Sequence, residues 1–412
     1  MPKKIDIEVP QSSPVWEAIE THLRARMQEL LQDMLMEEAD ELLARARYQR
    51  RAPDNPKVYR NGFGKPRRVS TTMGTLTVQR PRIRGLEERF ESLILPFFTR
   101  RTKEVGELLP ELYLHGLAHG DFELALRGLL GEGAPLSGAS IARLKADWQQ
   151  QYEVWASRSL ADLDIVYCWA DGLYVKAGLE GGKAALLVII GATRTGEKVL
   201  LSVTSGHRES TESWARVLRD LKARGVAAIR LMIADGHLGI WSALAQIYPE
   251  CAEQRCWNHK IVNVLDEVPP TKQAPVKQWL RKMMYAETRE QCEELRDKCI
   301  KQHRAKYPKA MAALERDWDR MVTYYEFPAE HWIHLRTTNV VESPFAAVRL
   351  RTNAGKRYKK TENATALIWK LLMVAAKSFR RLNAPHLLAV VATGGKYVNG
   401  KPVHAAVERI AA

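Results

Sequence analysis

The feature that most constrains the fold is the order of apolar segments in the middle of the chain. Four stretches have the length and apolar content of buried strands: residues 165–170, 184–190, 198–203 and 229–234. Residues 211–224, between the third and fourth stretches, have the apolar spacing of an amphipathic helix and are followed by Gly225. Short connections favour antiparallel pairing of the first three strands, whereas a helical crossover implies a parallel partner for the fourth. The pattern predicts an α/β sheet.

Three antiparallel strands, a crossover helix and a further strand follow the order of a ribonuclease H-like core. Asp171 follows the first predicted strand and Asp235 the fourth. If these strands are neighbours, their carboxyl ends bring both side chains together. Glu342 is the expected third carboxylate, on a helix that a preceding Thr or Asn can cap. Arg349, seven residues later, is expected on the same helix face, where it could meet a phosphate oxygen.

Three acidic side chains at one place predict a cation site. Taken singly, an Asp at a strand end often caps a turn, and a helical Glu usually lies on the surface. Together, Asp171, Asp235 and Glu342 offer the oxygen ligands that suit Mg²⁺ or Mn²⁺. Two such ions about 4 Å apart would activate a water or a 3′-hydroxyl and stabilise the leaving oxygen in phosphoryl transfer. We therefore predict that these three residues are both catalytic and metal-binding.

The net charge of +15 is concentrated in two segments. Residues 45–84 carry a net charge of +11, and residues 343–381 carry +9. Dense positive charge suits a polyanion, because each neutralised phosphate releases condensed counterions. The alternative is a solvated surface or one that binds an acidic partner. The predicted DNA-binding residues are Arg45, Arg47, Arg50, Arg51, Lys57, Arg60, Lys65, Arg67, Arg68, Arg80, Arg82, Arg84, Arg351, Lys356, Arg357, Lys359 and Lys360.

The chain divides by pattern into segments of different type. Residues 13–48 read as one long helix, and two β-prone runs around Gly74 predict a basic hairpin. Residues 136–144 resemble a turn followed by a capped helix, which occurs in helix-turn-helix units and in many other helices. The predicted segments are an N-terminal helical segment (1–50), a basic β-hairpin DNA-binding region (51–102), a helical, helix-turn-helix-like DNA-binding domain (103–158), a catalytic core in two pieces (159–259 and 336–385), a helical insertion between them (260–335) and a C-terminal tail (386–412).

A Cys-x-x-His pair, Cys256 and His259, lies between the second Asp and the Glu. Such a pair suggests zinc, but a tetrahedral site needs four ligands and no second pair follows, so no zinc is expected. His237 could contact the scissile phosphate or cap a helix. We predict that five residues support the active site: Cys256, His259, His237, Asn339 and Arg349.

Four blocks of sequence resemble bacterial insertion-sequence transposases of the Mutator-like family, which are Asp-Asp-Glu (DDE) transposases. The blocks are residues 171–176, 234–239, 255–260 and 337–343, the last followed by Arg349. The resemblance runs from about residue 50 to 385 and is most specific between 160 and 355. It implies a ribonuclease H-like domain interrupted by a helical insertion, which fits the separation of 107 positions from Asp235 to Glu342.

The resemblance also implies an activity. Asp171, Asp235 and Glu342 would be the metal ligands. The protein would bind the terminal inverted repeats of its element, cleave a strand at each end and let the freed 3′-hydroxyl attack another phosphodiester. A circular intermediate, a homodimer and no covalent protein–DNA intermediate are expected.

The composition bears on membrane association and on cellular location. No run of about 18 uncharged apolar residues is present, and the first residues lack the apolar stretch of a signal peptide, so no membrane association is expected. Five scattered cysteines favour a reducing, cytoplasmic location, with the nucleoid as the site of DNA binding.

Two alternatives stay open at the level of sequence. A ribonuclease H-like nuclease or resolvase would share the carboxylates and metals but would only hydrolyse. A catalytically idle DNA-binding protein descended from a transposase would bind without cleaving, although loss of a carboxylate would be expected there and all three are present.

Overall fold

The computed structural model describes residues 14–45, 48–50, 57–96, 99–117, 125–126, 130, 138–177, 183–206, 209–236, 238–354, 358 and 360–403. The chain forms two compact units, Met1–Arg143 and Leu144–Ala412. The division falls within helix α4 (Gly138–Ala156). Among the described residues, no helix is both long and apolar enough to cross a membrane.

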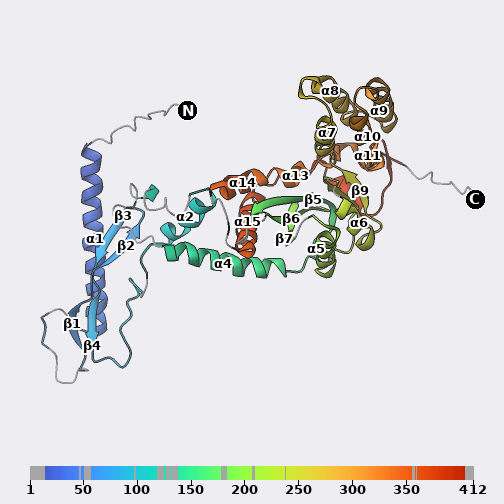
Figure 1. Ribbon diagram of the computed structural model, residues 1–412. Coiled ribbons are helices and arrows are strands. Elements are labelled where there is room, and N and C mark those ends of the chain that lie inside the picture. The colour runs from blue at the N-terminus through green and yellow to red at the C-terminus, as the bar shows by residue number, and fades with distance from the viewer. Residues whose placement is uncertain are drawn as a thin grey trace, which may run out of the picture. The chain divides into compact units, whose positions relative to one another are not determined.

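The second unit is built on a five-stranded mixed sheet with the strand order β7-β6-β5-β8-β9 (Figure 1). The strands are β5 (Ile165–Lys176), β6 (Lys183–Thr193), β7 (Lys198–Gly206), β8 (Leu231–Ala234) and β9 (Ala252–Arg255). β5, β6 and β7 pair antiparallel, whereas β8 is parallel to both β5 and β9. The α/β class, the three antiparallel strands and the parallel pairing of the first and fourth strands are confirmed.

The first strand is longer than the sequence pattern predicts. We expected it to end at Asp171, but β5 continues to Lys176, and Asp171 pairs with Val188 of β6. The β-prone residues Leu173, Tyr174 and Val175 extend the antiparallel ladder with β6 beyond the point where β8 ends. Asp171 therefore lies within β5, at the position where its parallel neighbour stops.

Helices α5 (Thr211–Ala223) and α6 (Leu238–Ile247) cover one face of the sheet. The Ser210 side chain caps α5 by accepting a hydrogen bond from the Ser213 backbone, and Gly225 follows its end with φ +110°. The apolar face of α5 is buried against Cys168 and Ala170 of β5 and against α6. This helix confirms the crossover that the sequence predicts.

The opposite face of the sheet packs against later parts of the chain. Tyr167 bonds His331 at 2.9 Å, and the Trp169 indole donates to the His334 carbonyl at 2.8 Å. Helices α13 (Asn339–Glu342), α15 (Thr361–Ala376) and α16 (His386–Ala392) also contact the strands on this side. The result is a three-layer arrangement in which alternate residues of β5 face different helical layers.

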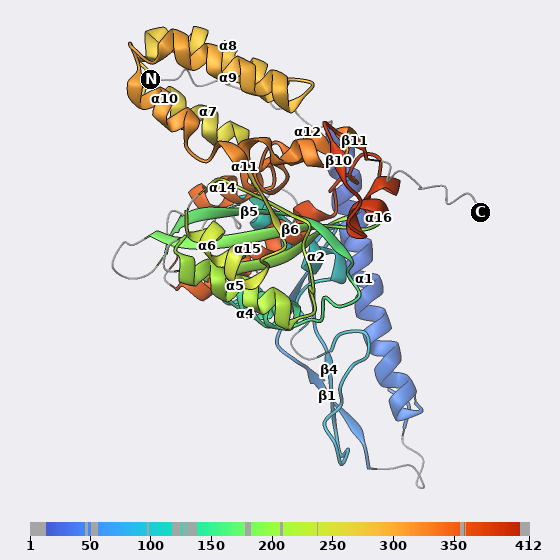
Figure 2. The same cartoon turned by 90° about the vertical axis from the view of Figure 1, so that its right-hand side faces the viewer.

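Between β9 and α13, the regular elements among the described residues are all helices. Figure 2 shows α7 to α10 extending beyond the sheet. These elements are α7 (Trp257–Leu265), η1 (Pro270–Lys272), α8 (Gln273–Met284), α9 (Arg289–His303), α10 (Pro308–Glu315), α11 (Trp318–Val322), η2 (Thr323–Glu326), η3 (Ala329–His331) and α12 (Trp332–Leu335).

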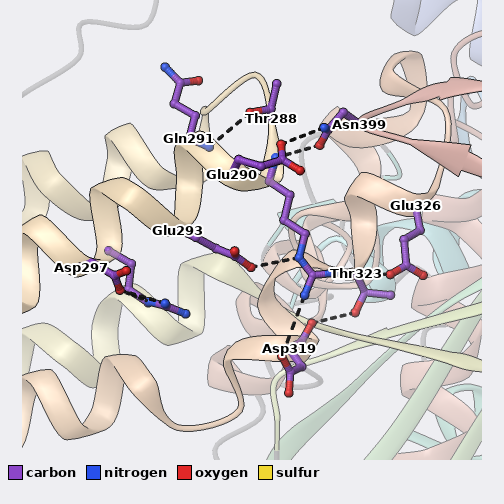
Figure 3. A network of polar contacts seen from close by, with 11 residues as sticks. Thr288, Glu290, Gln291, Glu293, Asp297, Asp319, Thr323, Glu326 and Asn399 are labelled. Atoms are coloured by element: carbon purple, nitrogen blue, oxygen red, sulfur yellow. Dashed lines mark hydrogen bonds and ion pairs between the residues drawn. The ribbon is translucent and has the colours of Figure 1, made fainter.

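A polar network fastens this helical region to the C-terminal part of the chain (Figure 3). Arg289 lies 3.0 Å from Glu293 and 3.6 Å from Glu326. The Asn399 side chain accepts from the Arg289 backbone at 2.8 Å and donates to Glu290 at 2.9 Å. Asn399 belongs to a hairpin of β10 (Tyr397–Val398) and β11 (Lys401–Pro402). Up to Val403, the segment assigned from sequence to a C-terminal tail is therefore folded.

The first unit contains a long helix and four short strands. α1 (Pro14–Leu43) ends five residues earlier than predicted, and Ala44 after it has φ +48°. β1 (Tyr59–Phe63) pairs antiparallel with β4 (Pro81–Arg84), and β2 (Arg67–Thr71) pairs antiparallel with β3 (Gly74–Val78). The second pair confirms the predicted hairpin. Its turn lies at residues 72–73, and Gly74 begins β3 with φ +113°. α2 (Lys103–Leu114) follows.

Side chains of α1 form hydrogen bonds with the backbone of β3 and of the residues on either side of it. Gln28 accepts from the Thr77 backbone at 2.9 Å. Gln32 both accepts from the Gln79 backbone and donates to its carbonyl, each at 2.9 Å. Arg24 donates to the Met73 carbonyl at 2.9 Å. Further along α1, Leu35 packs with Val69 of β2 and Val78 of β3.

Candidate active site

The pairing register places two of the predicted carboxylates side by side. Ala170 of β5 is the partner of Ala234 of β8, and the next residues along the two strands are Asp171 and Asp235. Ala170 and Ala234 both belong to the core under α5 and α6. Because side chains alternate along a strand, Asp171 lies on the other face, towards α13.

Glu342 reaches the same place from the far end of the helical insertion. It is the last residue of α13, which contacts β5 and β6. His259 of α7 links it to the second aspartate: its Nδ1 lies 3.4 Å from an oxygen of Asp235 and 3.8 Å from one of Glu342. The charges of His259 and Glu342 also act on Asp171. The structure thus brings the three predicted carboxylates together around His259.

Cys256 and Thr338 fasten the segment that carries Glu342 to the sheet. The Cys256 backbone donates to the Ala234 carbonyl at 2.8 Å, directly before Asp235. The Thr338 backbone donates to the Cys256 sulfur at 3.3 Å, and the Thr338 hydroxyl lies 3.2 Å from that sulfur. The same hydroxyl donates to the Glu342 carboxylate. Thr338, which the sequence marked only as a possible helix cap, is fully buried and makes this connection.

The electrostatics of the cluster favour a positive charge. Burial raises the pKa of Asp171 to about 7, with a further upward contribution from Glu342 and Glu209. Burial alone would lower the pKa of His259, but its bond to Cys256 and the nearby Asp235 and Glu342 raise that pKa to about 9. A buried carboxylate with a raised pKa beside two other carboxylates is an arrangement that a hard divalent cation would stabilise. The donor set therefore fits Mg²⁺ or Mn²⁺.

Cys256, His259 and Glu342 also place three potential metal-ligating atoms within 4.8 Å of one another. A tetrahedral zinc site needs four ligands. The Cys256 sulfur already accepts a hydrogen bond from the Thr338 backbone, a role that requires no metal. That no zinc binds here stays a prediction.

Three further residues were predicted to support the active site: Asn339, Arg349 and His237. Asn339 is exposed and accepts a hydrogen bond from Asn258 at 3.0 Å. Arg349 does not share a helix with Glu342, contrary to expectation, because α13 ends at Glu342 and α14 (Phe345–Ala354) begins three residues later. Pro344 lies between them and cannot continue the backbone hydrogen bonding of a helix. His237 lies outside the described residues.

A second feature, in the first unit, is a concave basic groove of about 1170 Å³ beside the strands. Burial and the neighbouring positive charge of Arg100 lower the pKa of Arg67, and burial with the charges of Arg67 and Arg89 lowers that of Arg80. Eight basic residues line this arginine groove: Lys65, Arg67, Arg68, Arg80, Arg82, Arg84, Arg89 and Arg100. Arg89 and Arg100 were missed from sequence because they lie beyond the densest part of the basic segment.

The remaining predicted DNA-binding residues differ in exposure. Arg50, Lys57 and Lys360 are exposed. Arg60 pairs with Asp40, and Arg45 donates to the Val58 carbonyl at 2.9 Å. Arg351 is only 3% exposed, so its side chain is buried rather than presented to a ligand. Outside the described residues lie Arg47, Arg51, Lys356, Arg357 and Lys359.

Comparison with known proteins supplies the family. Residues 3–381 match the family described as "Transposase, Mutator family". The chain belongs to this family. The match begins well before residue 50, where the resemblance noted from sequence starts, so it takes in the N-terminal helix as well.

Curated transposases of insertion sequences are similar to the chain over most of their own length. The transposase for insertion sequence element IS6120 of Mycolicibacterium smegmatis is 43% identical over 72% of this chain and 92% of its own. The transposase for IST2 of Acidithiobacillus ferrooxidans is 41% identical over 68% and 95%. The transposase for ISRM5 of Rhizobium meliloti is 26% identical over 88% and 89%.

Proposed function

We propose that this protein is a DDE transposase that binds the terminal inverted repeats of an insertion sequence and cleaves and joins DNA strands there. The observation that carries the proposal is the convergence of Asp171, Asp235 and Glu342 around His259, in a chain of the Mutator family. The strand order β7-β6-β5-β8-β9, with helices on both faces, supports a ribonuclease H-like core.

The three carboxylates would be the ligands of Mg²⁺ or Mn²⁺, as the pair of ions that is common in phosphoryl transfer. Bound there, the cations would supply Lewis-acid activation of the attacking oxygen and stabilisation of the leaving oxygen. The chain's own contribution is positioning. β5 and β8 fix the two aspartates in register, and Thr338 orients the Glu342 carboxylate. His259 provides positive charge beside the same carboxylates.

The arginine groove supports DNA binding by the first unit. The positive charges of neighbouring arginines in the groove repel one another. Phosphates that neutralise these charges relieve the repulsion and release counterions, so phosphate binding is favourable. Phosphate contacts of this kind position a duplex without reading its sequence. We assign the groove to the DNA of the transposon ends.

We further propose that the protein acts as a homodimer, because strand transfer brings two ends of an element together. The helix α1 supports this assignment. Its Trp16, Leu23 and Leu30 are spaced seven residues apart and are 63%, 46% and 61% exposed. Residues at this spacing lie near one line along a helix, as in the apolar seam of a coiled coil.

The proposed function is tested with labelled DNA that carries the element's own ends, with Mg²⁺ present or chelated. We expect metal-dependent products that join an end to a second DNA molecule, and no such products from Glu342→Gln. Glu362→Gln is the matched control, because Glu362 is an exposed glutamate in the first turn of α15. Nicking without joining would favour the hydrolytic nuclease, and end binding without either reaction would favour the idle DNA-binding protein.

A further inference from the structure

A fourth acidic residue, Glu209, lies against the backbone beside Asp171. A methyl group at Gly172 would come within 2.3 Å of Glu209 Oε1 and 2.4 Å of its carboxyl carbon. Only a residue without a side chain at position 172 leaves room for this carboxylate where it stands. Gly172 immediately follows Asp171, so the Glu209 carboxylate lies against the residue next to a proposed ligand.

The backbone around Glu209 is held in place on two further sides. Ser210, the next residue, caps α5 through its bond with Ser213. A methyl group at Gly239 would lie 2.6 Å from the Glu209 carbonyl and 2.8 Å from the Thr211 nitrogen, so the start of α6 packs closely on this segment. Gly239 is four residues after Asp235. Glu209 is thus fixed against the two segments that carry the proposed aspartate ligands.

Glu209 and Glu342 approach β5 from opposite faces. Gly172 has the same orientation in the strand as Ala170, which faces α5 and α6. Asp171 faces the other way, towards α13 and Glu342. β8 ends at Ala234, so β5 has no registered partner on that side beyond Ala170. A cation at the end of β8 is therefore accessible to carboxylates from both layers of helices.

We infer that Glu209 is a fourth carboxylate ligand of the proposed divalent-cation site, placed on the α5 side of β5. The inference rests on the proposed function, because it adds a ligand to that same site. Four carboxylates give two hard cations more oxygen ligands than three, while still leaving positions for water and phosphate.

The test is Mn²⁺ binding to the full chain without DNA, measured by the loss of the free-ion electron paramagnetic resonance signal. Glu209→Gln and Glu209→Ala are compared with wild type, with Asp171→Asn as a variant of a proposed ligand. Glu212→Gln is the matched control: Glu212 lies three residues away in the first turn of α5, is exposed and pairs with Arg219. Circular dichroism in EDTA checks that each variant is folded.

We expect the Glu209 variants and Asp171→Asn to raise the Mn²⁺ dissociation constant about tenfold or more, and Glu212→Gln to leave it unchanged. If Asp171→Asn weakens binding but both Glu209 variants bind Mn²⁺ as wild type does, Glu209 is not a ligand and the proposed function stands. If Asp171→Asn also binds as wild type does, the cation site of the proposed function is itself wrong, and the inference about Glu209 falls with it.

Discussion

At the scale of single residues, Thr338 determines where the Glu342 carboxylate points. The Thr338 hydroxyl lies within hydrogen-bonding distance of both the Cys256 sulfur and the Glu342 carboxylate, and it has one proton to donate between them. The backbone of Cys256 is in turn bonded to the Ala234 carbonyl, next to Asp235. A short chain of contacts therefore sets the distance between two carboxylates that are 107 positions apart in sequence.

We predict that Thr338→Val lowers the rate of strand cleavage about 10–100-fold, whereas Thr338→Ser, which keeps the hydroxyl, stays within a few-fold of wild type. Valine has nearly the shape of threonine but has no proton to donate to Glu342. Single-turnover cleavage at saturating DNA measures the effect, and a gel-shift assay should show equal end binding by both variants. Equal cleavage rates for the two variants would mean that packing alone orients Glu342.

At the scale of elements, sequence patterns predict the sheet well because continuous apolar runs leave few alternatives for residues 184–190 and 198–203. They predict strand ends poorly. The charged Asp171 looks like a terminus, yet β6 supplies backbone partners for five more residues of β5. The single helix expected to carry both Glu342 and Arg349 is in fact two helices, because the expected periodicity did not account for Pro344.

The candidate site was predictable only in part for a related reason. Asp171, Asp235 and Glu342 could be named because each stands in a recognisable local pattern and in a family motif. Contacts between distant segments have no local signature. The bond of Thr338 to Cys256, 82 positions away, and the approach of Glu209 to Gly172 depend on tertiary packing.

The arginine groove leads to a prediction for β4. Arg82 and Arg84 are exposed, line the groove and alternate along this strand. We predict that Arg82→Gln with Arg84→Gln weakens DNA binding and lowers the slope of log affinity against log salt by up to about 1.8, or roughly 0.9 per lost phosphate contact. Fluorescence anisotropy with end DNA at several salt concentrations measures this slope.

The control for that experiment is Arg26→Gln, because Arg26 lies on α1, outside the residues that line the groove, and pairs with Glu29 at 3.0 Å. Its slope should match that of wild type. A double variant with an unchanged slope would place the phosphate contacts on another surface.

At the scale of the whole molecule, the chain keeps its basic groove and its carboxylate cluster in separate units. We predict that replacing Trp16, Leu23 and Leu30 together by Ser converts the protein from a dimer to a monomer, because each is a large apolar side chain on the surface of α1. Light scattering coupled to size-exclusion chromatography measures the mass. The control is Val154→Ser on α4, also exposed; a dimer that survives the triple change would be formed through other surfaces.

The bonds from α1 to the edge of β3 have a consequence for how the chain behaves before it is fully folded. An open strand edge invites another chain to add a strand, which is a common start of aggregation. Here the side chains of Gln28 and Gln32 form hydrogen bonds with backbone groups at that edge. Because α1 precedes the hairpin in sequence, the ribosome synthesises this helix before it synthesises the strands whose edge the helix covers. The hairpin can be shielded by its own chain from the moment it forms, and a basic, β-prone segment is kept from pairing with its copies on neighbouring ribosomes.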